Sequence, residues 1–169
     1  MKRILMIAIA LMPLVLMAQA RIGIVNSQQL FDLLPEKVEA EAELKVLSDR
    51  YHAEYELLQK EFDKKYADYQ TVAADASMPE TIKERRVQEL QEGDKKLREF
   101  ERRAADDIAA QRVVLTKPIT DKIQEAIRQV GEQGDFDLVL DTAVTPVAYA
   151  GANTIDITSM VKALLGLEF

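Results

Sequence analysis

The residues that most often carry chemistry in proteins are sparse in this sequence of 169 residues. It has a single histidine, His52, and no cysteine, so a thiol nucleophile and a histidine-rich metal site are both excluded. Paired acids such as Asp106 and Asp107 could act as general acid and base only in a pocket, and they lie in charge-rich helical sequence. No glycine-rich phosphate loop or nucleophile elbow is present. We therefore expect a protein that is not an enzyme and that needs no metal or cofactor.

Aromatic side chains are the other group that could bind a partner, and five of them follow one another in a single segment. These are Tyr51, Tyr55, Phe62, Tyr66 and Tyr69. Their rings can contact apolar surface while the tyrosine hydroxyls stay hydrated. Packing inside the protein is favoured for Tyr55 and Phe62. We predict partner contacts for Tyr51, Tyr66 and Tyr69, and Tyr66, just off the regular rows, is the best candidate to face a cavity beside the helices.

Residues 36–116, called the arm below, are expected to position these rings on two long helices. Two seven-residue rows mark the first helix, with intervals of four and three that are typical of a coiled coil. The rows are Leu44, Tyr51 and Leu58, and Tyr55, Phe62 and Tyr69. On the second helix the rows are less regular: Leu90, Leu97 and Ala104, then Val87, Ile108 and Leu115, with Asp94 and Glu101 interrupting the latter.

A turn at about residues 75–79 is predicted to join the two helices into an antiparallel hairpin. Ser77 and Glu80 have the spacing of a capping box, and Pro79 is tolerated in a first helical turn. Gly93 and Pro118 are expected to be the flexible points of the arm, because glycine weakens a helix and an internal proline removes a hydrogen bond and kinks it.

Residues 21–35 and 117–169 are expected to form one small strand-containing body. Strands are predicted at 22–25, 136–141 and 147–150. So small a core is marginal without disulfides, which predicts that several copies associate through it. The fold class is thus α+β, mostly α, with a long helical hairpin protruding from a small body. The residues expected to contribute to association are Ile22, Ile24, Phe136, Leu138, Leu140, Val147 and Tyr149.

The first twenty residues have the features of a secretory signal peptide. Lys2 and Arg3 precede an apolar run over residues 4–17, and Ala18-Gln19-Ala20 is a small-residue cleavage motif. The run is short for a membrane-spanning helix, which needs about 20 apolar residues. Cleavage would leave 20 of the 22 basic residues against 29 acidic ones, a net charge of −9. That charge argues against nucleic acid as a partner.

The mature sequence resembles the Skp/OmpH family of periplasmic chaperones over essentially its whole length. The resemblance rests on several segments: 24–26 with Leu30 and Phe31, Lys65 with Tyr69 and Gln70, Ile123 with Ile127 and Val130, then 136–141, 147–150, and 156–158 with Val161. It implies a jellyfish-like homotrimer whose helical arms enclose a cavity. It also implies that the cavity holds unfolded outer membrane β-barrel proteins without ATP.

The sequence departs from the family in charge, because the best-known members are strongly basic. Peripheral contact with membranes or lipopolysaccharide is therefore left open, and no lipopolysaccharide site is carried over. Two other functions compete with the chaperone: a structural coiled-coil scaffold or spacer of the cell envelope, and an adaptor hairpin of an export system. An irregular, aromatic-bearing helix contact favours the chaperone, because a spacer should have a continuous heptad pattern.

Overall fold

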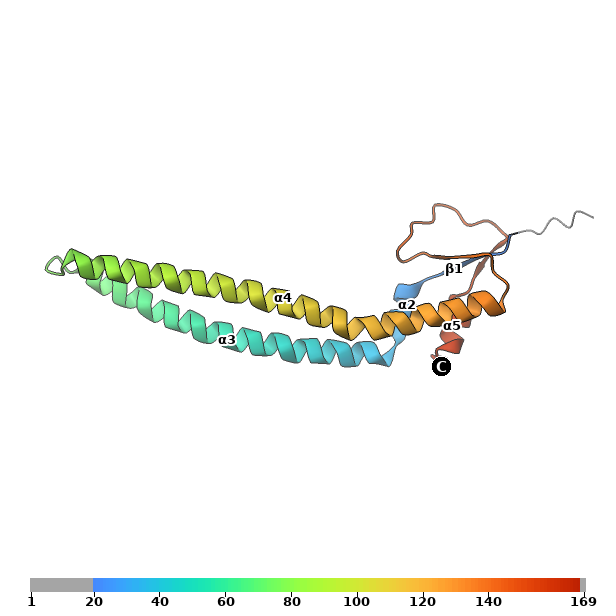
Figure 1. Ribbon diagram of the computed structural model, residues 1–169, viewed down its shortest axis with the longest axis horizontal. Coiled ribbons are helices and arrows are strands. Elements are labelled where there is room, and N and C mark those ends of the chain that lie inside the picture. The colour runs from blue at the N-terminus through green and yellow to red at the C-terminus, as the bar shows by residue number, and fades with distance from the viewer. Residues whose placement is uncertain (1–19, 168–169) are drawn as a thin grey trace, which may run out of the picture. The chain divides into compact units, whose positions relative to one another are not determined.

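The computed structural model describes residues 20–167, and it is mostly helical with one small sheet (Figure 1). The predicted signal peptide, apart from its last residue, and Phe169 lie outside the described residues. The elements, in chain order, are β1 (Ile22–Val25), α2 (Ser27–Leu33), α3 (Pro35–Ala74), α4 (Glu80–Gln133), β2 (Leu138–Asp141), β3 (Thr154–Asp156) and α5 (Thr158–Leu164). The predicted mostly helical α+β class is thus confirmed at this level.

The described chain forms two compact units. One comprises residues 20–27 and 126–167, and the other comprises residues 28–125. The helix α4 is continuous from the second unit into the first.

The first unit is built on a three-stranded parallel sheet in the order β2-β1-β3. The central strand β1 pairs Ile22 with Leu138 on one side and with Thr154 on the other. Its Val25 is buried, as are Ile157 beside β3 and Val161 of α5. The predicted strands at 22–25 and 136–141 are therefore present, the second in the shorter range of β2.

The predicted strand at 147–150 is wrong. This segment has no strand structure, and the third strand is β3 at Thr154–Asp156. The reason lies in the pairing: β3 occupies the free edge of β1, where Ile157 N donates to Ile24 O at 2.8 Å. Both edges of β1 are thus paired, by β2 and by β3, and Tyr149 is 86% exposed.

The second unit consists mainly of α3 and α4, whose 40 and 54 residues correspond to helices about 60 and 80 Å long. Pro35 opens α3 at a position where its missing N–H costs no hydrogen bond. Contacts between the helices join the start of α3 to late residues of α4: Glu36 pairs with Lys122, Tyr51 with Asp107 and Glu61 with Lys96. This order of contacts is that of two helices running in opposite directions.

The turn between α3 and α4 is held by Asp75 rather than by the predicted capping box. Its carboxylate accepts hydrogen bonds from Ser77 N at 2.8 Å and from Ser77 Oγ at 2.6 Å. The hydroxyl bond is the larger cause of a lowered pKa for Asp75, and the backbone bond adds to it. The hydroxyl of Ser77 therefore donates its hydrogen within the turn. The helix α4 begins at Glu80, just after Pro79.

Candidate binding surface along the two long helices

Both seven-residue rows predicted for α3 lie at the contact between α3 and α4, where their side chains are half-buried. The aromatic rings of this contact pack closely. Tyr51 meets Phe100 edge-on with ring centroids 5.9 Å apart, and Tyr55 approaches the same ring at 6.5 Å. Phe100 is only 9% exposed, so it is the centre of an aromatic cluster that fixes the two helices to each other.

Hydrogen bonds to carboxylates satisfy the two tyrosine hydroxyls of this cluster. Tyr51 Oη donates to Asp107 Oδ2 at 2.7 Å, which raises the pKa of Tyr51. A hydrogen bond from Tyr55 to Glu101 raises the pKa of Tyr55 in the same way. Tyr51, one of the predicted partner-binding residues, is thus placed in the contact between the helices, and its hydroxyl is already bonded.

The other two predicted partner-binding tyrosines are more accessible. Tyr66 is 48% exposed and lies beside the contact, four residues after Phe62 and three before Tyr69. Tyr69 is half-buried and lines a hollow of about 590 Å³ together with Ala73, Val87 and polar side chains of α4. A partner could therefore reach Tyr66 and Tyr69 without separating the helices.

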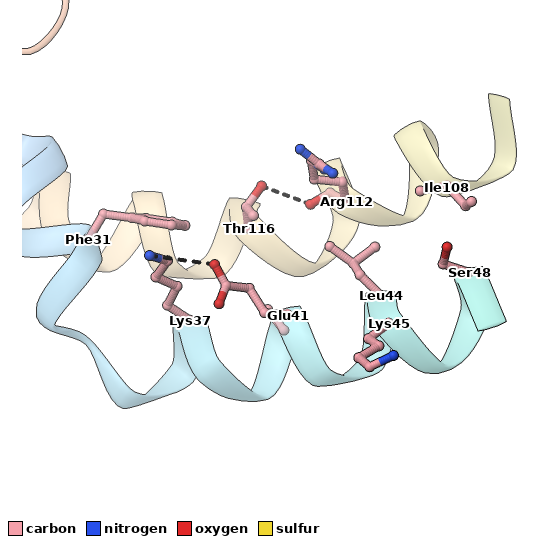
Figure 2. A pocket seen from close by; sticks show the side chains of 10 residues that line it. Phe31, Lys37, Glu41, Leu44, Lys45, Ser48, Ile108, Arg112 and Thr116 are labelled. Carbon is pink, nitrogen blue, oxygen red and sulfur yellow. Dashed lines mark hydrogen bonds and ion pairs between the residues drawn. The ribbon is translucent and has the colours of Figure 1, made fainter. Parts of the chain in front are cut away.

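A second hollow, of about 420 Å³, lies near the other end of the α3–α4 pair (Figure 2). Its apolar lining comes from Phe31 of α2, Ala40 and Leu44 of α3, and Ile108 of α4. Its charged lining residues are Lys37, Glu41, Lys45 and Arg112. The hollow is thus lined by both apolar and charged side chains, a mixture that suits an amphipathic segment of another protein.

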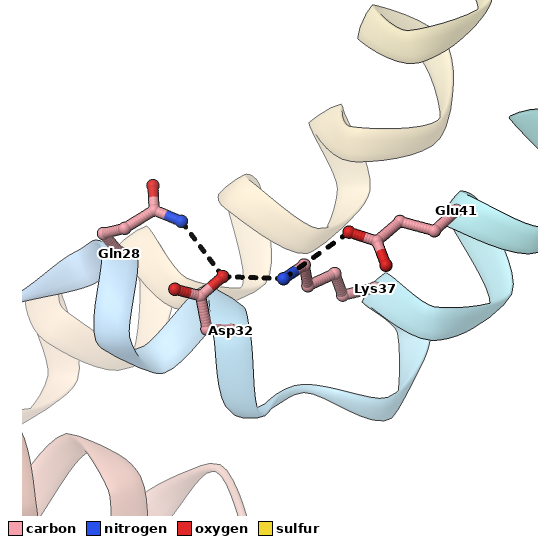
Figure 3. A network of polar contacts seen from close by, with 4 residues as sticks. All are labelled: Gln28, Asp32, Lys37 and Glu41. Carbon is pink, nitrogen blue, oxygen red and sulfur yellow. Dashed lines mark hydrogen bonds and ion pairs between the residues drawn. The ribbon is translucent and has the colours of Figure 1, made fainter.

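A chain of polar contacts fixes α2 to the start of α3 beside this hollow (Figure 3). Lys37 Nζ lies 2.8 Å from Asp32 Oδ1 and 3.5 Å from Glu41 Oε1, and Gln28 Nε2 donates to Asp32 at 3.1 Å. The hydrogen bond from Lys37 is the largest cause of the lowered pKa of Asp32, and the same bond raises the pKa of Lys37.

An ion pair between Glu36 and Lys122 joins the first turn of α3 directly to α4, at 2.5 Å. The hydrogen bond from Lys122 is the main cause of the lowered pKa of Glu36. These groups are partly exposed, so they fix geometry more than they add stability.

Gly93 and Pro118, the predicted flexible points, both lie inside the unbroken helix α4. Gly93 lies against Phe62, and a Cβ atom at Gly93 would come within 2.9 Å of Phe62 Cδ2. Glycine is therefore needed there for close approach of the helices, a role that the sequence reasoning did not consider.

Near Pro118, Thr116 Oγ1 donates to Arg112 O at 2.8 Å and Thr120 Oγ1 donates to Thr116 O at 3.1 Å. Such bonds accompany bent helices.

The residues predicted to associate copies through the small unit differ in their exposure and in their secondary structure. Ile22 and Ile24 are half-buried in β1, Phe136 and Leu140 are half-buried at β2, and Leu138 is 49% exposed. Val147 and Tyr149 lie in the segment without strand structure, with Val147 half-buried.

Phe100 is the residue of this surface that sequence reasoning missed. It was hidden because the rows on the second helix were sought at seven-residue spacing, where the acidic Glu101 interrupts the pattern. The buried and half-buried residues of α4 repeat at eleven instead: Leu97, Ile108, Ile119 and Val130; Phe100 and Gln111; and Ala104, Leu115 and Ala126. Phe100 shares its row with the polar Gln111, so its burial follows from its place between Leu97 and Ala104, three residues after one and four before the other.

Within residues 20–167, no group of three or more His, Asp or Glu side chains could hold a metal ion. Likewise, none of the helices in this range is long and apolar enough to cross a membrane.

Comparison with known proteins found a family model and solved structures that match the chain. Residues 21–165 match the family model described as outer membrane protein (OmpH-like). A 2.83 Å crystal structure from Caulobacter crescentus CB15, described as a candidate outer membrane chaperone (OmpH-like), is similar in fold with a TM-score of 0.63. It shares 19% sequence identity, and the match covers 88% of this chain and 85% of the other. No functionally curated protein matches the chain.

Proposed function

The chain belongs to the OmpH-like family of outer membrane proteins, and from this membership we propose that it is a periplasmic holdase chaperone that uses no ATP. Its clients are unfolded outer membrane β-barrel proteins. It reaches the periplasm through the signal peptide at residues 1–20, and it carries out no catalysis.

The observation that carries the proposal is the apolar surface that α3 and α4 leave accessible along their length. Six of their large apolar side chains are 48% to 66% exposed: Val38, Val46, Leu57, Tyr66, Val113 and Val114. They are spread over the helices rather than gathered in one patch, and charged residues surround them. An unfolded barrel strand presents an apolar side chain at every second residue. Many weak, separate contacts therefore suit it better than one shaped pocket.

The two hollows support the same proposal. Each is lined by both apolar and charged or polar side chains, and each lies along the α3–α4 pair. A client segment held there would bury its apolar side chains while its backbone stays hydrated. Tyr66 and Tyr69 are the tyrosines that we propose to contact clients, and Tyr51 supports them from within the helix contact.

The working form is proposed to be a homotrimer in which three antiparallel coiled-coil hairpins enclose the client. Exposed apolar side chains in the small unit support association of copies, because Leu138 is 49% exposed, Val144 77% and Tyr149 86%. Burying such side chains between copies would add the apolar contact that a small core lacks. Ile22, Ile24, Phe136 and Leu140 would support that interface from the sheet.

The test combines mass in solution with suppression of aggregation. A urea-unfolded β-barrel outer membrane protein is diluted into buffer with and without the mature chain, and light scattering is followed. We expect a trimer that lowers scattering without ATP. A monomer that leaves scattering unchanged would contradict the proposal, and so would a trimer without effect, which is the behaviour expected of a spacer.

Variants show whether the exposed apolar side chains are responsible. The triple variant Leu57→Gln, Tyr66→Gln and Val113→Gln should fold normally and suppress aggregation less. The matched control is Glu56→Gln, Lys64→Gln and Glu99→Gln, which changes exposed charged residues of the same helices. Equal loss in both variants would contradict the assigned role.

A further inference from the structure

Arg21, the residue that follows the predicted cleavage motif, is fixed to the segment between α4 and β2. Its backbone N donates to Asp137 Oδ2 at 2.7 Å, and Asp137 N donates back to Arg21 O at 3.0 Å. Its guanidinium donates from Nη1 to Gly134 O and lies 4.5 Å from the centroid of the Phe136 ring. Three kinds of contact therefore converge on one residue at the start of the central strand β1.

The backbone contact is the one whose chemistry changes on processing. Before cleavage, Arg21 N is a neutral peptide nitrogen with one hydrogen. Hydrolysis by a signal peptidase adds one water across the Ala20–Arg21 peptide bond. Ala20 leaves with the carboxylate, and Arg21 keeps an amino group that is largely protonated at neutral pH. The nitrogen that lies 2.7 Å from the Asp137 carboxylate thus becomes a positively charged donor with three hydrogens.

We propose that Asp137 is a binding site for the newly formed α-ammonium group of Arg21, so that removal of the signal peptide strengthens the attachment of β1 to the sheet. A charge-assisted hydrogen bond is about twice as strong as a neutral one. Because β1 is the middle strand of β2-β1-β3, a tighter start to β1 supports both of its neighbours. The small unit therefore reaches its full stability only after processing.

The inference rests on the export part of the proposed function, but its test needs only purified protein. The mature chain beginning at Arg21 is prepared with a free α-amino group and with an acetylated one. Acetylation keeps the N–H that bonds to Asp137 and removes only the charge. Thermal unfolding is followed by circular dichroism at neutral pH, low salt and equal protein concentration.

We expect the free amine to unfold about 2–3 °C higher, the shift of an exposed ion pair in a chain of this size. The difference should disappear in Asp137→Asn, which keeps the shape and a hydrogen-bond acceptor. It should persist in Asp135→Asn, the matched control. Asp135 is two residues away, and its positive φ of 48° is well tolerated by asparagine.

Three results would overturn the inference. These are equal unfolding temperatures for the free and acetylated chains, a difference that survives unchanged in Asp137→Asn, and a difference lost equally in Asp135→Asn. If Asp137→Asn does not fold, the free and acetylated wild-type chains are compared again in about 1 M NaCl, where the screening length is about 3 Å. If the difference between their unfolding temperatures does not decrease in this salt, an ion pair between Arg21 and Asp137 is excluded. Loss of chaperone activity plays no part in any of these readouts.

Discussion

The ring of Phe62 on α3 occupies the space that a side chain at Gly93 on α4 would need, since a Cβ atom there would lie 2.9 Å from Phe62 Cδ2. Gly93→Ala should therefore lower the free energy of unfolding by about 1–2 kcal/mol, the usual cost of overpacking. In a Phe62→Leu background the clash is relieved, and the same change should raise stability by up to about 1 kcal/mol through helix propensity. Urea unfolding of the four proteins measures both effects. The same sign in both backgrounds would contradict the close packing.

Tyr51 and Tyr66 should separate stability from client binding. Tyr66 is 48% exposed, so Tyr66→Ala should change stability by less than about 0.5 kcal/mol. It should still raise the chaperone concentration needed for half-maximal suppression of aggregation about two- to threefold, the effect of losing one weak contact among many. Tyr51→Ala should mainly lower the unfolding temperature, because it removes a ring packed on Phe100. The reverse pattern would exclude Tyr66 as a client contact.

The hydrogen bond from Tyr51 to Asp107 should be measurable on its own. Tyr51→Phe keeps the ring and removes the hydroxyl, which should cost about 0.5–1 kcal/mol. Asp107→Ala should cost a similar amount, and the double variant little more than either single one, because both remove the same bond. Urea unfolding gives all three values. Full additivity would show that the bond adds no stability.

Stability of the α2–α3–α4 region should fall in acid. Hydrogen bonds from lysines lower the pKa values of Asp32 and Glu36, whose ordinary values are 3.8 and 4.5. The unfolded chain therefore binds protons more readily than the folded one, so these contributions are complete above about pH 5 and are lost as the pH falls through the lowered folded-state values.

The midpoint of urea unfolding, measured between pH 3 and 7, should decrease as the pH falls. In Glu36→Gln the midpoint should decrease less steeply with pH below about pH 4.5. Glu39→Gln is the matched control, because Glu39 is an exposed carboxylate nearby with no ion pair among the described residues. An unchanged slope in Glu36→Gln would contradict the role given to the pair with Lys122.

Pro118→Ala should stabilise α4 locally, because it restores a backbone N–H that can donate to Val114 O and removes the clash of the ring with that turn. Hydrogen exchange of the amides at residues 115–121 should slow in the variant. If clients require Pro118 as a flexible point, the variant should suppress the aggregation of clients over a narrower range of sizes than the wild type does. Unchanged exchange would show that the helix already accommodates the proline without local opening.

The sequence predicts the helical elements well and the small sheet less well, for a physical reason. The rows of α3 are spaced at seven residues because their side chains meet α4, and that local periodicity is visible without any structure. The strand predicted at 147–150 failed because strand formation depends on a distant partner, and β3 took the free edge of β1. Alternation alone carries no information about which edge is free.

The distinction between local periodicity and contact with a distant partner also applies to the candidate site. Tyr66, the tyrosine that lies off the regular rows, is 48% exposed, and its contact with partners stays a prediction. Tyr51 was predicted to contact partners, although it shares a seven-residue row with packed residues, and its contacts with Phe100 and Asp107 depend on how α4 is aligned with it. The proximity of Gly93 to Phe62 depends on the same alignment, which is set by the whole length of both helices.

The buried and half-buried residues of α3 and α4 share one repeat. A spacing of eleven residues joins Ala40, Tyr51 and Phe62 on α3, as it joins Leu97, Ile108 and Ile119 on α4. Eleven residues in three turns are 3.67 residues per turn, close to the 3.6 of a straight α-helix, so this repeat favours only slight right-handed winding. Two helices that share it can lie against each other for many turns without either one being overwound.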